Sequence, residues 1–296
     1  MGNTCCNTPK EISTTSNFKA AAITINKEPI SKASSNIPPI SEPESHQPSS
    51  NIAQPIEESE IPKISAKHQI PEFEWSLCYQ DLQDKNLPTI GPYQYPTGEV
   101  YIGQYLNGVR HGLGTQICQN GSYYEGMWLH DKMNGRGRQI FENGDTYDGE
   151  WSQNKKNGYG LEKFEDGSVF EGQFENGYQN GKGKFKWSDG ATYTGDFYQN
   201  DVHGEGIYVW SDGKRYFGDW IHNKMEGFGE FHWLDGRRYK GYFIGDKKEG
   251  YGEFYWANGK SYKGYWKDGK MNGEGQLTNS NNQYIKGDWV DGERVS

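Results

Sequence analysis

The chain has 296 residues, of which only 32% are hydrophobic while 15% are aromatic and 40 are glycines, an unusual mixture for a compact globular domain. Its formal net charge of −9 argues against nucleic-acid binding, and no run of about 18 apolar residues predicts a transmembrane helix. Four cysteines, none at a C-x-x-C spacing, argue against a disulfide framework or a zinc site and fit a reducing compartment.

The N-terminal sequence MGNTCC carries the most specific modification signal of the chain. Gly2 follows a removable Met, and Cys5 and Cys6 stand close behind it. This is the arrangement of N-myristoylation followed by S-palmitoylation, although the motif asks for Ser or Thr where this chain has Cys6. Because a single myristoyl chain binds membranes only weakly, the two cysteines would supply the second signal. We therefore expect a lipid anchor at Gly2, Cys5 and Cys6, with an unmodified N-terminus as the alternative.

Residues 1–70 are predicted to be a disordered tether behind this anchor. They are rich in Ser, Pro, Asn and Glu and contain a single glycine, Gly2. Such a segment buries too little apolar surface to offset the entropy of ordering. Residues 71–90 differ, because the stretch EFEWSLCYQDLQD at residues 72–84 places Phe73 and Leu77 on one side of a helix. Either a short helix lying on the first copies or a linker with a partner motif fits this stretch.

From residue 91 the chain follows a repeat of 23 residues without gaps or insertions. Position 4 of the repeat is Tyr or Phe, position 8 is aromatic, and positions 6, 15 and 17 are glycine in every full copy. The spacing by two of positions 4, 6 and 8, and of 15, 17, 19 and 21, predicts two β-strands per copy with a ring-and-glycine face and a polar face. Position 1 of the eight full copies is Gly98, Gly121, Gly144, Gly167, Gly190, Gly213, Gly236 and Gly259, and a partial copy lies at each end.

The junctions between copies read Asn-Gly or Asp-Gly and predict tight turns. A three-residue loop that ends in a left-handed glycine keeps the rings on one face, which a two-residue turn would not. With positions 9 to 14 as the second loop, we expect position 4 to pair with 19, position 6 with 17, and position 8 with 15, so that each large ring faces a glycine. The predicted fold class is all-β, an elongated single-layer twisted antiparallel sheet of tandem hairpins.

The unit G-x-x-Y-x-G-x-W-x6-G-x-G resembles the MORN repeat, named for membrane occupation and recognition nexus. One copy shows it at Gly144, Tyr147, Gly149, Trp151, Gly158 and Gly160. The resemblance spans residues 98–296, and the last half-copy departs from it at Asn282 and Ile285, where Gly and Tyr are expected. The resemblance implies twisted antiparallel sheets with a groove, which act as scaffolds at membranes and in cytoskeletal or ciliary structures.

We predict no catalytic, cofactor or metal site, because the histidines lack paired ligand spacing and no nucleophile, base and orienting group recur together. We expect a non-enzymatic scaffold, anchored by acyl groups to the cytoplasmic face of a membrane, that binds a helix or extended peptide of a protein partner along an aromatic groove. The alternative for the groove rings is that they only pack on one another. The residues expected to line the groove are Tyr147, Trp151, Tyr193, Phe197, Tyr216, Trp220, Tyr239 and Trp266.

The sequence leaves two other functions open. One is a structural role in a cytoskeletal or ciliary assembly, in which ribbons pair end to end or through their faces, a homodimer being one such pairing. The other is recognition of phosphoinositides by the repeats, which the negative charge of the chain disfavours.

Overall fold

A computed structural model describes residues 53–62, 73–74 and 86–296 of the chain. The predicted lipid anchor at Gly2, Cys5 and Cys6 and most of the predicted helix or linker lie outside the described residues. Within these ranges the regular structure is β-strand apart from one 3₁₀ turn, η1 (Glu58–Glu60), and the strands form an antiparallel sheet of twenty strands. The chain divides into two compact units, the first reaching Gly167 and including Phe174–Gly177, the second holding Ser168–Gln173 and Tyr178–Ser296.

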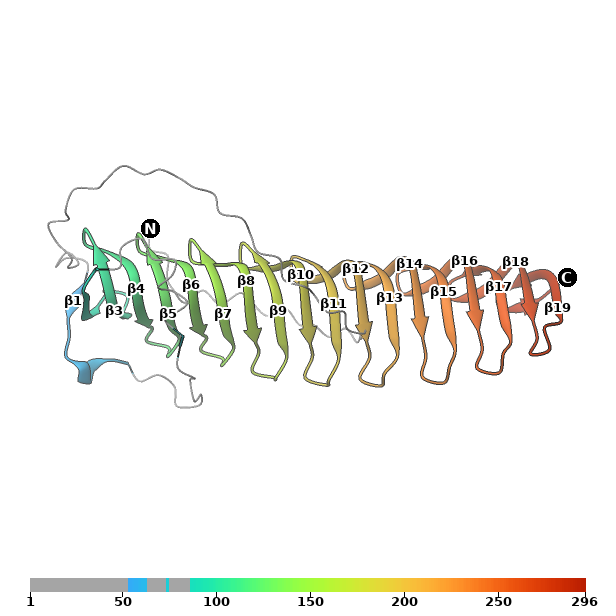
Figure 1. Cartoon of the computed structure of the whole chain (residues 1–296), viewed down its shortest axis with the longest axis horizontal. Coiled ribbons are helices and arrows are strands. Elements are labelled where there is room, and N and C mark those ends of the chain that lie inside the picture. The colour runs from blue at the N-terminus through green and yellow to red at the C-terminus, as the bar shows by residue number, and fades with distance from the viewer. Residues whose placement is uncertain (1–52, 63–72, 75–85) are drawn as a thin grey trace. The chain divides into compact units, whose positions relative to one another are not determined.

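In the first unit each strand pairs antiparallel with its neighbours in the sequence, and Figure 1 shows the hairpins side by side in chain order. Residues 53–62 fall in the segment predicted to be disordered, and here they contribute the first strand and η1. The strands are β1 (Gln54–Pro55), β2 (Thr89–Gln94), β3 (Val100–Leu106), β4 (Val109–Ile117), β5 (Tyr123–Leu129), β6 (Lys132–Ile140), β7 (Thr146–Ser152) and β8 (Lys155–Lys163).

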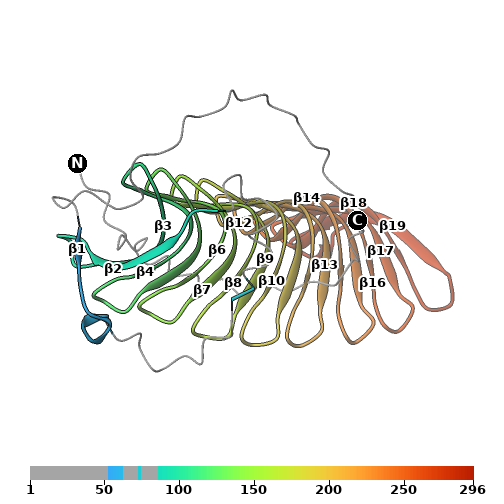
Figure 2. The ribbon, with the colours of Figure 1, turned by 60° about the vertical axis from the view of Figure 1, so that its left-hand side comes forward.

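The second unit repeats the same hairpin order, and its strands follow one another from yellow to red in Figure 2. β9 (Val169–Glu175) contributes residues to both units. The other strands are β10 (Tyr178–Lys186), β11 (Thr192–Tyr198), β12 (Asp201–Val209), β13 (Arg215–Ile221), β14 (Lys224–His232), β15 (Arg238–Ile244), β16 (Lys247–Tyr255), β17 (Ser261–Lys267), β18 (Lys270–Thr278), β19 (Tyr284–Val290) and β20 (Glu293–Arg294).

The register predicted across the junction between copies is confirmed. Between β10 and β11, Phe185 pairs with Tyr193, Gly183 with Gly195, and Gly181 with Phe197. These are position 19 with 4, position 17 with 6, and position 15 with 8. The loop has the predicted three residues, since the N–H of Gly190 donates to the carbonyl of Trp187 at 3.0 Å and Gly190 adopts a φ of 90°.

The prediction of a second loop at positions 9 to 14 is wrong, because the first strand continues to position 9 and the second already begins at position 12. β11 and β12 are joined only by Gln199 (φ 48°) and Asn200 (φ 72°), a two-residue turn with both residues left-handed, as in type I′ hairpins. A bulge after Gly195 absorbs the surplus residues, so Phe197 pairs with Val202 rather than with the glycine at position 15. The tight turn is favoured because its twist matches the twist of the two strands.

The glycine rows provide the space that the rings occupy, as predicted, but the ring in question is that of position 4. A Cβ added to Gly206 would lie 2.1 Å from Oη and 2.3 Å from Cζ of Tyr193, and one added to Gly195 would lie 2.4 Å from the same Oη. Tyr193 therefore lies flat over both glycines and is fully buried. The core of each unit is this single layer of rings on glycine.

Candidate functional site

The side of the sheet that carries positions 4, 8, 13, 19 and 21 is called the ring face here. Along it the rings of positions 4 and 8 alternate edge to face, an arrangement we call the aromatic zipper. In the second unit the Tyr193 ring lies 5.1 Å from that of Phe197 and 5.8 Å from that of Trp220, both at an interplanar angle of 84°. In the first unit Tyr147 and Trp151 are 5.1 Å apart at 89°. Such pairs each contribute about 0.5–1.5 kcal/mol beyond their buried area.

Hydrogen bonds within the sheet satisfy the polar atoms of most zipper rings. The Oη of Tyr193 lies 3.1 Å from the carbonyl oxygens of both Asp196 and His203, and the indole Nε1 of Trp151 donates to the carbonyl of Gly137 at 3.0 Å. Burial raises the pKa of Tyr193 well above its ordinary value. The same bond from position 4 to the carbonyl of position 7 recurs at Tyr101, Tyr124, Tyr147, Tyr216, Tyr239 and Tyr262. The hydroxyls of these tyrosines thus need no outside hydrogen-bond partner.

All eight residues predicted to line a groove belong to this zipper. Their exposed fractions lie between 0% for Tyr147 and 6% for Trp266. They come together on one face, as the sequence indicated, but they pack chiefly on one another. Whether a partner touches them stays a prediction, and the accessible part of the ring face comes from other positions.

Accessible rings occur at position 21, which follows the last strand residue and precedes the three-residue loop; this position is Phe141 and Phe164 in two copies of the first unit and Trp in the next four copies. We call Trp187, Trp210, Trp233 and Trp256 the tryptophan row; all four are half-buried. Trp187 stacks on Tyr208 with centroids 4.7 Å apart at 17°, and Trp233 lies 4.3 Å from Phe231. These tryptophans were not among the rings predicted to line the groove, because parity alone does not distinguish a ring at mid-strand from one at a strand end.

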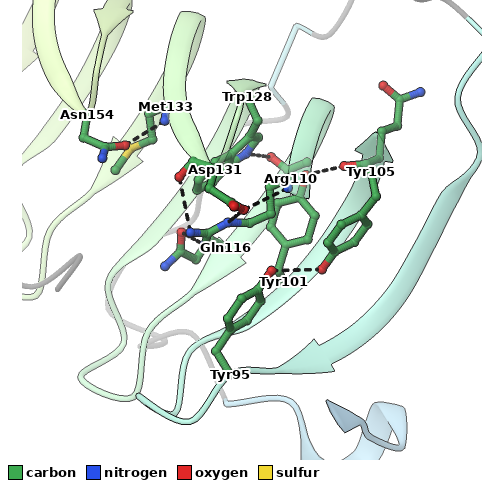
Figure 3. A network of polar contacts seen from close by, with 11 residues as sticks. Tyr95, Tyr101, Tyr105, Arg110, Gln116, Trp128, Asp131, Met133 and Asn154 are labelled. Atoms are coloured by element: carbon green, nitrogen blue, oxygen red, sulfur yellow. Dashed lines mark hydrogen bonds and ion pairs between the residues drawn. The ribbon is translucent and has the colours of Figure 1, made fainter. Parts of the chain in front are cut away.

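The side chain at position 13 also lies on the ring face. In the first copy this residue is Arg110 (Figure 3). The guanidinium carbon of Arg110 lies 4.5 Å from the Trp128 ring centre and 4.9 Å from that of Tyr95. Its Nε donates to the carboxylate of Asp131 at 3.2 Å, and its Nη1 donates to Oε1 of Gln116 at 3.1 Å. This cation is fully partnered by side chains of its own copy and the next.

Two lysines occupy position 13 in other copies, and they differ in their partners. Lys156 forms an ion pair with Glu162, which stands at position 19 as Gln116 does in the first copy. In the copy of Lys248 position 19 is Phe254, and no ion pair to Lys248 is found among the described residues. Its Nζ lies 4.5 Å from the Trp266 ring centre and 4.7 Å from that of Phe254. Burial lowers the pKa of Lys248 to about 8.

The part of the chain that the structure describes holds no group of three or more His, Cys, Asp or Glu side chains arranged to ligate a metal ion. Over the same residues no helix has the length and apolar character required to cross a membrane.

Several solved structures resemble this sheet. The chain is similar to the TCP10 domain of Danio rerio CPAP, with a TM-score of 0.37 and 12% identity over 68% of this chain and 100% of that one. It is also similar to the SAS-4 (dCPAP) TCP domain of Drosophila melanogaster, solved in complex with a proline-rich motif of Ana2, with a TM-score of 0.25 and 15% identity over 59% and 83%. These low TM-scores carry no conclusion about function. A comparison with curated proteins gives no match.

The repeat itself decides the family. The MORN repeat matches eight consecutive segments, each beginning at the position-4 ring or its equivalent: residues 101–123, 124–146, 147–169, 170–192, 193–215, 216–236, 239–261 and 262–284. MORN repeats build a non-catalytic scaffold, which agrees with a layer whose rings and glycines serve packing. The chain is therefore a member of the MORN-repeat family.

Proposed function

We propose that this protein is a non-enzymatic scaffold that binds a helix or an extended peptide of a protein partner on the ring face, chiefly through the tryptophan row. The observation that carries the proposal is the half-burial of Trp187, Trp210, Trp233 and Trp256, in contrast with the buried zipper rings. Tryptophan is the residue most enriched at binding hot spots, and a contiguous accessible apolar row is typical of interaction sites.

The environment of Lys248 also supports the proposal that a partner binds on the ring face. Its ammonium lies among the rings of the ring face without an ion pair in the described chain, whereas Lys156 has Glu162 at the equivalent place. A partner that offers a carboxylate beside an apolar stretch would supply the missing counter-charge, and an ion pair completed in a partly desolvated setting gives specificity.

The test replaces Trp210 and Trp233 by Asn, the residue that Asn279 provides at the same repeat position. Quantitative cross-linking of proteins bound to the wild type and to Trp210→Asn/Trp233→Asn is expected to show a set of partners lost from the variant. Tyr198→Gln, which removes an exposed ring at the other turn, serves as the control. Unfolding midpoints establish that both variants fold. An unchanged partner set with the double variant would contradict the proposal.

We further propose that Gly2 is myristoylated and that Cys5 and Cys6 are palmitoylated, which would hold the scaffold at the cytoplasmic face of a membrane. The support is the MGNTCC sequence alone. Fractionation of cells expressing the wild type and Gly2→Ala, with mass analysis of the N-terminal peptide, is expected to show an acylated wild type at membranes and a released variant. An unmodified peptide and an unchanged position would favour the role in a cytoskeletal or ciliary assembly instead. Binding of Gly2→Ala to anionic vesicles would favour phosphoinositide recognition by the repeats.

A further inference from the structure

The opposite side of the sheet, which carries positions 5, 7, 16 and 18, is called the outer face here. Position 7 on this face has a structural task in most copies: its side-chain oxygen accepts the backbone N–H of position 16, beside the bulge. Oδ2 of Asp219 accepts from Phe228 at 3.1 Å, and Oε1 of Gln104 accepts from Leu113 at 2.7 Å. The same bond joins Glu150 to Tyr159, Gln173 to Lys182, and Asp196 to Glu205.

Three copies break this rule, because position 7 is Met127, Tyr242 or Tyr265 and offers no carboxylate or amide oxygen. Each of these side chains instead stands opposite an apolar residue at position 16 of the preceding copy. Met127 pairs with Leu113. Tyr242 pairs with Phe228 and Tyr265 with Tyr251. The two ring pairs have centroids 5.4 and 5.7 Å apart and edge-to-face geometry.

The first of these apolar pairs is covered by the chain itself. Phe73 packs on Leu113 and Met127, and both Phe73 and Leu113 are 8% exposed. The guanidinium carbon of Arg138 lies 5.3 Å from the Phe73 ring centre. In the sequence Phe73 stands between Glu72 and Glu74. The apolar pair at positions 16 and 7 thus binds an aromatic side chain, and a cation lies beside the bound ring.

The other two pairs lie in the second unit and are open to solvent. Phe228 is 46% exposed, Tyr242 51%, Tyr251 47% and Tyr265 51%. Lys240 stands beside the first pair, with Nζ 6.0 Å from the Phe228 ring centre. Lys263 lines a shallow hollow with Tyr251 and Tyr265, and both lysines also form ion pairs, with Glu230 and Glu253 respectively. Like the copy of Met127, these two copies lack the acceptor at position 7. No described residue, however, packs on their apolar pairs as Phe73 packs on Leu113 and Met127.

We propose that Phe228, Tyr242, Tyr251 and Tyr265 form a docking site for an extended segment of a partner polypeptide that carries an aromatic side chain flanked by acidic residues. The seating of Phe73 on Leu113 and Met127 provides the pattern for the contact. The cations Lys240 and Lys263 match the acidic flanks, as Arg138 stands beside Phe73. This surface lies on the side opposite the tryptophan row, so it adds a second binding surface to the proposed scaffold.

The probe for the test is a fluorescein-labelled peptide of residues 68–77, which contains Glu72, Phe73 and Glu74, and a second peptide in which Phe73 and Trp75 are both replaced by Ala. Fluorescence anisotropy measures their binding to the full chain. The key variant is Tyr242→Asp/Tyr265→Asp, which restores the acceptor found at Asp196 and Asp219 and is therefore expected to keep the fold. If the unfolding midpoint of the Asp variant lies below that of the wild type, the variant Tyr242→Gln/Tyr265→Gln is used in its place, because Gln104 and Gln173 provide the same acceptor in other copies.

The expected result is saturable binding of the first peptide to the wild type and to the control Tyr198→Gln, with an affinity about tenfold or more lower for the Tyr242/Tyr265 variant. The peptide without aromatic residues is expected to bind no better than this variant does. Equal affinity for wild type and variant, equal affinity of the two peptides, or the lack of saturable binding would each overturn the proposal. Self-association of the wild type that the variant abolishes would overturn the choice of occupant, since a second copy would then fill the site.

Discussion

Gly206→Ala tests the packing on which the whole sheet depends. A methyl group at this residue would lie 2.1 Å from Oη and 2.3 Å from Cζ of Tyr193, distances that force the ring to move. The ring has nowhere to go, because Tyr193 is fully buried between Phe197 and Trp220. No left-handed φ is found at Gly206, so the backbone alone would favour Ala over Gly by about 0.5–1 kcal/mol.

The expected net effect follows from these opposing contributions. Overpacking a rigid site costs about 1–3 kcal/mol, and displacement of the buried Tyr193 hydroxyl from the carbonyls of Asp196 and His203 costs about 1 kcal/mol more. After the backbone gain is subtracted, we expect the free energy of unfolding to fall by about 2 kcal/mol.

A double-mutant cycle with Tyr193→Ala, followed by urea unfolding with tryptophan fluorescence, isolates the ring as the cause. Tyr193→Ala alone is expected to cost about 3–5 kcal/mol, but in that background Gly206→Ala should be neutral or stabilising by about 0.5 kcal/mol. Gly190→Ala is the control: no atom lies within 4 Å of its added Cβ, and it destabilises only through its φ of 90°, whatever residue 193 is. If Gly206→Ala costs the same with and without the Tyr193 ring, the packing argument is refuted.

Three further predictions concern the turn, the zipper and Lys248. Asn200→Ala should lower the free energy of unfolding by about 2 kcal/mol, because it removes the acceptor for the N–H of Gln179 at 2.8 Å and puts Ala at a φ of 72°. Asn200→Gly loses the same acceptor without the unfavourable φ, so it should cost about half as much in the same urea assay. Trp151→Phe keeps the ring, as in the copies with Phe197 and Phe243, and should cost about 1 kcal/mol for the lost bond to Gly137, with no change in the urea m-value. Lys248→Met, the residue of Met225 at the same position, should raise stability at neutral pH by about 2 kcal/mol after allowance for the attraction of the rings to the ammonium. Lys248 loses its proton near a pKa of about 8 in the folded state but only near 10.5 in the unfolded chain. The wild type therefore gains stability as pH rises through this window, and the difference in stability between it and Lys248→Met should shrink. Thermal unfolding at about pH 7 and about pH 9.5 measures this difference, and a constant value would contradict the prediction.

The register across the copy junctions was predictable because parity leaves one choice once the rings must share a face. Only a three-residue loop places Phe185 opposite Tyr193, and the structure has that loop. The second turn was also signalled, since Asn107-Gly108 and Asn176-Gly177 are strong type I′ sequences at positions 10 and 11. It was missed because the position-15 glycine was interpreted as space for a ring, whereas its left-handed φ, 59° at Gly204, belongs to the bulge.

Accessibility on the ring face could not be predicted from the sequence, because it depends on the neighbouring copies. Trp220 is 1% exposed since the tyrosines of two copies, Tyr193 and Tyr216, close over its ring. Trp210 lies beyond the end of β12, where it contacts Phe231 but is not enclosed in this way. The contact of Phe73 with Leu113 was predictable only in part, because the helical spacing of residues 72–84 suggested a segment lying on the first copies but did not indicate which residues it would contact.

The division of labour among repeat positions indicates where function is concentrated. Positions 4, 6, 8 and 17 do the same packing in every full copy, so changes there alter stability wherever they are made. Positions 7, 13 and 21 carry several residue types. Two departures that packing does not require lie on β15 and β16, because Tyr242 has no acceptor role and Lys248 forms no ion pair among the described residues, and Trp233 of the tryptophan row follows the neighbouring β14. Because Tyr242 lies on the outer face and Lys248 and Trp233 on the ring face, this stretch of the second unit offers binding groups on both sides of one layer. Substitutions at these three residues should therefore change binding while leaving the unfolding midpoint nearly unchanged or, for Lys248→Met, raised.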